Sequence, residues 1–225
     1  MAMYRVENEL RRTGNPQDLD IADRLAARIK DKGDFILPAL MREVPVVTSR
    51  FKDEQREFLK KEGYVFYDLT GQSMSSLKAV GREIYSDKPF EHISSMRSEV
   101  AINPSKLFLP KSNGKNLKKQ EEMVYKFSQE LGKKVKGVKA IIGQVPDYTE
   151  LAFKYFDATG DRLFGHDSPL KYWATTKTSI NGDLFAVVGF SAPHLGGPEF
   201  AVGSWESRHG FDIGAVAPLV VPVGK

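Results

Sequence analysis

Apolar residues recur at helical spacing in four segments before residue 170, with charged or polar residues between them, and a fifth segment, 52–62, has acids in its first turn and lysines in its last. Glycines that favour helix ends follow several of these segments, at Gly33, Gly63, Gly132 and Gly160. The pattern predicts helices over 18–32, 52–62, 74–84, 117–131 and 147–159. In the last of these, Asp147 and Glu150 have the spacing of a capping box, so Asp147 is expected as the helix N-cap.

Short apolar runs between these helices predict strands over 46–47, 64–69, 99–102 and 139–145. The first run reaches the second through the helix over 52–62. Because a crossover helix normally joins parallel strands, we expect these two strands to be parallel neighbours. The segments 86–98 and 103–115 are polar and irregular, and they are expected to be loops.

After residue 170 the pattern changes to strands separated by turns. Strands are predicted over 172–178, 184–190, 200–205 and 215–223, with turn signals at Asn181–Gly182 and Gly196–Pro198. The chain is therefore expected to have an α+β fold. One mixed sheet would be shared by an N-terminal part of α/β type, with helices packed on the sheet, and an antiparallel C-terminal part.

The composition is that of a globular protein with its own core. In 225 residues, 41% are hydrophobic and 28% are charged, which predicts a single domain over 1–225, with a division into 1–165 and 166–225 as the alternative. The absence of cysteine excludes disulfides, thiolate metal sites and catalytic thiols. No apolar signal or membrane-spanning stretch is visible, so we expect a cytoplasmic protein without a membrane partner.

The positive charge is concentrated in one segment. Residues 106–139 hold ten lysines against three glutamates, a surplus of +7, whereas the whole chain carries only +4. Attraction to a polyanion such as nucleic acid is therefore expected there. The candidate contacts lie off the apolar stripe of the predicted helix or beyond its end, at Lys118, Lys119, Lys133 and Lys134.

The loop Thr70–Ser73 lies between a predicted strand and a predicted helix, where α/β sheets place ligands. It lacks the glycine spacing of the known phosphate-binding loops, and the simpler interpretation makes Ser73 a helix N-cap. The candidate ligand-binding residues at this edge are Asp68, Thr70, Gly71, Gln72, Ser73 and His166. If they act in catalysis, the protein would be a small hydrolase or transferase, but no spacing of a known nucleophile motif accompanies them.

Glu206 and His209 stand three residues apart and could be metal ligands together with His166 or His194. Such a pair is informative on a helix, whereas this one lies in a region of strands and glycines. We therefore expect no bound metal or other cofactor, with Glu206 and His209 as the ligands if one is present.

The stretch from Glu99 to Gly165 resembles a family of uncharacterised bacterial proteins, in its segments EVAINP, DYTELAFKY and DATGDRLFG. The resemblance extends through KYWATTKT to APLVVPV and implies a bacterial origin, but it implies no activity, cofactor or catalytic residue. With no coherent catalytic set among four histidines, we expect a non-enzymatic binding or interaction protein whose partner is a protein or a polyanion.

Overall fold

The computed structural model describes residues 47–86, 90–165, 171–190 and 200–223, which belong to one compact unit that begins at Val47. The helix expected over 18–32, the strand residue Val46 and the turn at Gly196–Pro198 lie outside these residues. None of the described helices is long and apolar enough to cross a membrane.

The described part contains the helices α4 (Asp53–Lys61), α5 (Met74–Ala79), α6 (Leu117–Lys134) and α7 (Val145–Thr159), with a 3-10 turn at Pro104–Lys106. Its strands are β1 (Val65–Thr70), β2 (Ile84–Ser86), β3 (Arg97–Ile102), β4 (Val138–Ile141), β5 (Trp173–Asn181), β6 (Leu184–Phe190), β7 (Phe200–Glu206), β8 (Gly214–Ala215) and β9 (Leu219–Pro222).

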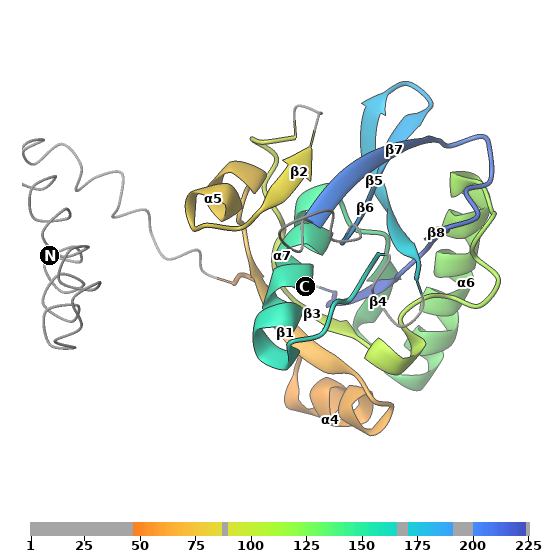
Figure 1. The fold of residues 1–225 in the computed structure, drawn as a ribbon. Helices are drawn as coiled ribbons and strands as arrows, with labels where there is room; N and C mark the ends of the chain where they lie inside the picture. The colour runs from red at the N-terminus through yellow and green to blue at the C-terminus, as the bar shows by residue number, and fades with distance from the viewer. Residues whose placement is uncertain (1–46, 87–89, 166–170, 191–199, 224–225) are drawn as a thin grey trace, which may run out of the picture. The chain divides into compact units, whose positions relative to one another are not determined.

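These strands form two sheets (Figure 1). The first has the order β1-β3-β9-β4, and all its neighbours are antiparallel. The second has the order β2-β7-β6-β5-β8, with parallel pairs at both edges and antiparallel pairs between them. The α+β class is thus confirmed, but the strands expected in one shared sheet are divided between two.

Helix α7 contacts strands of both sheets, β1 on one side and β5 and β6 on the other. Every residue from Val145 to Phe153 is therefore buried, and the apolar ones among them are part of the core. The fully buried Tyr148 shows how tightly this helix is held: its hydroxyl donates to the carbonyl oxygen of Ala217 at 2.6 Å and accepts from the amide of Gly143 at 3.1 Å.

Helix α6 covers the free edge of the first sheet. It packs on the edge strand β4, with Leu117, Val124 and Leu131 buried as its apolar stripe predicts. The hydroxyl of Ser128 accepts a hydrogen bond from the amide of Ala140 at 2.9 Å. The amide of Ala140, which does not pair with β9, is thus hydrogen-bonded to α6 instead of to solvent.

Several predicted boundaries are corrected. Helix α5 ends at Ala79, with Val80 as its C-cap and Gly81 at a positive φ of 87°, so Ile84 belongs to β2 instead of a helix. Strand β4 ends at Ile141 because α7 already begins at Val145. The segment 86–98 was expected to be a loop, but β2 ends and β3 begins within it.

The predicted parallel neighbours are also corrected. Strand β1 pairs with β3 in the antiparallel sense, and Ser49 makes a parallel bridge to Ser98 of β3. The backbone of the segment before α4 therefore pairs with β3 and not with β1. The periodicity that identified the strands contains no information on which of them pair.

Candidate functional site

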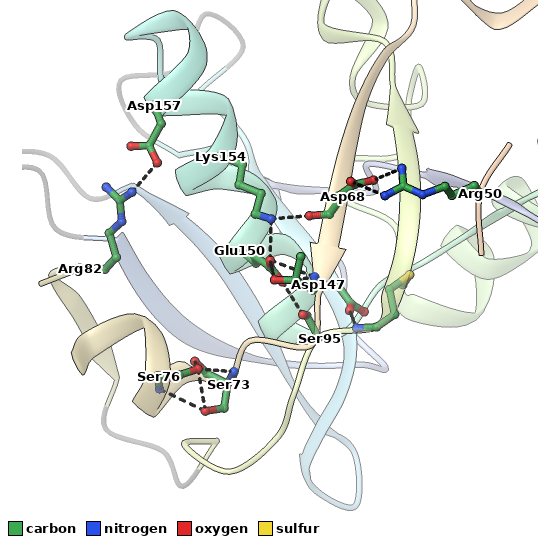
Figure 2. Close-up of polar contacts among 12 residues, drawn as sticks. Arg50, Asp68, Ser73, Ser76, Arg82, Ser95, Asp147, Glu150, Lys154 and Asp157 are labelled. Carbon is green, nitrogen blue, oxygen red and sulfur yellow. Dashed lines mark hydrogen bonds and ion pairs between the residues drawn. The ribbon is translucent and has the colours of Figure 1, made fainter. Parts of the chain in front are cut away.

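A buried carboxylate joins α7 to the end of β1. Glu150 is only 1% exposed, and its Oε1 accepts from the amide of Thr70 at 3.0 Å, from the Thr70 hydroxyl at 2.7 Å and from Lys154 Nζ at 2.9 Å. Its Oε2 accepts from the hydroxyl of Ser95. Figure 2 shows Lys154 and Ser95 directed at the carboxylate of Glu150. A carboxylate buried this completely is tolerated because both of its oxygens accept hydrogen bonds from protein donors.

Asp147 lies one helical turn before Glu150 and is buried as well. Its Oδ1 accepts from the amide of Met96 at 2.7 Å, and its Oδ2 accepts from the amide of Gln144 at 2.7 Å. Burial raises the pKa of the Asp147 carboxyl above its ordinary value, although these two backbone amides act in the opposite direction. Gln144, and not Asp147, is the N-cap of α7, so Asp147 occupies the third position of the helix and the expected N-cap is wrong by three residues.

The lysine of this cluster also connects α7 to β1. Lys154 donates to the backbone carbonyl of Asp68 as well as to Glu150. The side chain of Asp68 points elsewhere and forms a bidentate pair with Arg50, with N–O distances of 2.9 and 3.1 Å, at the surface. Figure 2 shows Arg50 and Asp68 on the opposite side of the β1 ribbon from Glu150.

The acids of this region are thus occupied in structural contacts. A general acid or base needs a titratable group within reach of a substrate proton, and both carboxylates here are buried and bound by protein donors. Their arrangement fastens the segment 94–96 and the end of β1 to one helix. We interpret these two carboxylates and their donors as a structural cluster that stabilises the fold.

The predicted loop Thr70–Ser73 is adjacent to this cluster, and its polar groups are also hydrogen-bonded within the protein. The amide of Thr70 donates to Glu150, so it does not point to a free anion site. Gly71 has a φ of 77°, and a β-carbon there would come within 2.9 Å of Arg97 Nε. The carbonyl of Gln72 accepts from the amide of Ser95 at 2.9 Å.

Ser73 is the N-cap of α5, with its hydroxyl accepting from the amide of Ser76 at 3.1 Å. The simpler interpretation of this loop as a capped strand-to-helix turn is therefore confirmed by the geometry. His166, the remaining candidate of this group, lies outside the described residues.

Glu206 and His209 do approach each other, with His209 Nδ1 at 2.9 Å from a carboxylate oxygen of Glu206. Both side chains are exposed, that of His209 by 75% and that of Glu206 by 54%. Among the described residues, no group of three or more histidine, aspartate or glutamate side chains is placed to hold a metal ion. The pair at the end of β7 is a contact between two exposed side chains at the surface.

The lysine-rich segment exposes its lysines to solvent along its length. All ten of its lysines are exposed: Lys106, Lys111, Lys115, Lys118, Lys119, Lys126, Lys133, Lys134, Lys136 and Lys139. No ion pair joins any of them to a described residue, whereas Lys177 uses Glu121 at 3.1 Å. The four lysines singled out in the sequence lie on α6 itself.

Glu150, Lys154 and Ser95 were missed as partners by the sequence interpretation. A signal was present: Glu150 directly precedes a run of apolar helix residues, Leu151, Ala152 and Phe153. An acid next to such a run predicts a buried carboxylate with dedicated partners. The partners themselves come from distant segments and could not be named.

Comparison of the chain with protein-family models, with curated proteins and with solved structures gave no significant match.

Proposed function

We propose that this chain is a non-enzymatic binding protein and that it holds a nucleic acid by its phosphates on the lysine-rich segment 106–139. The observation that supports this proposal is the state of the lysines: all ten are exposed, and none is neutralised by an ion pair with a described residue. A cationic surface that the protein leaves unpaired attracts phosphates and gains entropy when their counterions are released.

The lysines of α6 are ordered along the helix. Lys119, Lys126 and Lys133 follow each other at intervals of seven residues, which places them nearly in line on a helix. Helix geometry puts this stripe on the side opposite Val124 and Leu131, which are buried against the sheet. Lys118 and Lys134 lie to the two sides of the stripe.

The spacing of the stripe suits a phosphate backbone. Two turns of helix separate its successive lysines, a rise of about 10 Å. A phosphate chain can pass along such a row and contact each ammonium group in turn. Glu122 and Glu130 lie three or four residues from these lysines on the same helix, so the row with its two glutamates has a net charge of +1, and the larger surplus of +7 belongs to the segment 106–139 as a whole. Tyr125, which is 63% exposed on the same helix, offers a ring on which a base could stack.

The alternative of a small hydrolase or transferase at the end of β1 receives less support. Its acid, Asp68, is paired with Arg50, the amide of Thr70 is bound to the buried Glu150, and Ser73 is used as a helix cap. The lysine surface needs no rearrangement to meet a partner.

The test is a titration of fluorescein-labelled single-stranded RNA, followed by anisotropy at several salt concentrations. If the proposal is right, the logarithm of the binding constant falls steeply with the logarithm of the salt concentration, by about 0.7 for each phosphate contacted. The variant Lys119→Gln/Lys126→Gln/Lys133→Gln should bind more weakly and show a slope reduced by about 2.

A matched control removes the same charge elsewhere. Lys60→Gln/Lys61→Gln/Arg208→Gln changes three exposed cations outside the segment and should keep the parent slope. Equal losses in the two triple variants would show only an effect of net charge, and binding that does not depend on salt would refute the proposal.

A further inference from the structure

A pocket of about 450 Å³ lies between α4, the 3-10 turn at Pro104–Lys106 and the C-terminal half of α6. Cavities that hold small molecules in proteins typically have volumes of about 300–1,000 Å³. Its interior is apolar and mostly aromatic, formed by Phe58 of α4, Phe108, and Phe127 and Leu131 of α6. An apolar body of a few rings or a short branched chain would bury its surface there.

The pocket is held open by contacts on both sides. Asn103 donates from its side chain to the carbonyl of Glu62 at 2.8 Å, which fastens the end of α4 to the loop after β3. Gln55 donates to the carbonyl of Lys136 at 2.8 Å, which fastens the same helix to the turn after α6. Because both walls are fixed before a ligand arrives, binding loses little energy to ordering them.

Four charged side chains line this pocket: Glu62, Lys106, Glu130 and Lys134. None of the four forms an ion pair with a described residue, so each is available to a ligand. The hydroxyl of Tyr64, which also lines the pocket, has no hydrogen-bond partner among the described residues. A polar group of the ligand would therefore find donors at the same place.

The charges of the lining cancel, so the surroundings decide the sign of the field. The segment 106–139, which includes the α6 wall, carries +7, whereas α4 with its flanking residues Lys52 and Glu62 carries as many acids as bases. A negative group can contact the lysines that line the pocket, Lys106 and Lys134, while the apolar body of the same molecule fills the interior.

We infer that this pocket binds a small molecule with an apolar, ring-containing body and a single anionic group. This inference depends on the pocket alone and is independent of nucleic-acid binding by the outer stripe of α6. The recognition needs both parts of the ligand: burial of the body supplies affinity, and the two lysines select the charge.

A matched pair of fluorescent probes tests the two parts separately. 1-Anilinonaphthalene-8-sulfonate carries the anionic group, and N-phenyl-1-naphthylamine has the same ring system without it. With the folded full chain, both probes should bind at one site per molecule, and the sulfonate should bind more tightly. If neither probe binds at one site, the pocket does not take ligands of this class; if both bind equally, the anionic group plays no part.

Charge-removing variants locate the site. Lys106→Ala/Lys134→Ala should weaken binding of the sulfonate by about three- to tenfold and leave the neutral probe unchanged. The control Lys115→Ala/Lys118→Ala removes two exposed lysines of the same segment that do not line the pocket, and it should leave both probes unchanged. An equal loss of the sulfonate in the control would mean that the general field, and not this pocket, attracts it, and the inference would be wrong.

Discussion

Glu150 accepts two hydrogen bonds from Thr70, one from the backbone amide at 3.0 Å and one from the hydroxyl at 2.7 Å. One carboxylate thereby holds both the main chain and the side chain at the end of β1, and it joins α7 to a strand that is far away in the sequence. The residue belongs to the framework of the protein, and the first prediction follows from that.

Glu150→Gln should destabilise the protein by about 1.5–3 kcal/mol, because hydrogen bonds to a charged group are lost and the new amide donors face the donors of Thr70, Ser95 and Lys154. Urea unfolding followed by circular dichroism measures the change. Glu122→Gln makes the same chemical change at an exposed position of α6 and should have almost no effect. If the free energy of unfolding decreases no more for Glu150→Gln than for Glu122→Gln, the structural role of the Glu150 carboxylate is contradicted.

The second prediction concerns Asp147 and pH. Since burial raises its folded-state pKa above the unfolded value, the folded protein binds more protons there, and the contribution of Asp147 to stability decreases as pH rises above 3.8, the ordinary pKa of the group. Asp147→Asn cannot titrate. The free energy of unfolding of the parent minus that of the variant should therefore fall between pH 4 and the folded-state pKa.

This difference is measured by urea unfolding of both proteins at a series of pH values. Asp53→Asn, at an exposed position in the first turn of α4, controls for the general effect of removing an acid. A difference that rises with pH would mean that the amides of Met96 and Gln144 outweigh the effect of burial.

The third prediction contrasts two glycines. Gly165 has a φ of 98°, and a β-carbon there would lie 2.1 Å from the carbonyl oxygen of Phe190, a backbone atom that cannot move aside. Gly165→Ala should therefore destabilise the protein by more than about 2 kcal/mol. Gly132→Ala, in α6, meets nothing within 4 Å and should instead stabilise the helix by about 0.5–1 kcal/mol. Thermal unfolding of the two variants should show shifts of opposite sign.

The fourth prediction concerns the covered edge of the first sheet. Ser128→Ala removes the acceptor for the amide of Ala140 and should cost about 1 kcal/mol. Ser204→Ala, at an exposed position of β7, is the control. Hydrogen exchange gives the sharper measurement, because the Ala140 amide should exchange faster in the variant while its neighbours in β4 keep their protection. Unchanged exchange at Ala140 would refute the contact.

Much of the secondary structure could be predicted because its causes are local. The helices at 53–61, 117–134 and 145–159 depend on apolar spacing and end residues that a window of the sequence contains. Strand partners were not predictable in this way: β2 pairs with β7, and β9 lies between β3 and β4. Such pairings are set by packing between distant segments, which leaves no mark in either strand alone.

In the candidate site, too, the local features could be predicted and the long-range contacts could not. Ser73 could be predicted as an N-cap because a cap acts on its own helix. The partners of Glu150 could not, since Thr70 and Ser95 become its neighbours only when α7 lies across the sheet. The exposed state of the lysines followed from their places off the apolar stripe of α6.

The position of β9 has a consequence for how the chain is made. Residues 219–222 fill the gap between β3 and β4, with Ala101 paired to Val220 on one side and Val138 paired to Pro222 on the other. While the protein is being synthesised, β3 and β4 leave the ribosome before the strand that lies between them. The first sheet can therefore close only after residue 222 has emerged, and until then β3 and β4 each lack the partner at the edge that β9 later fills.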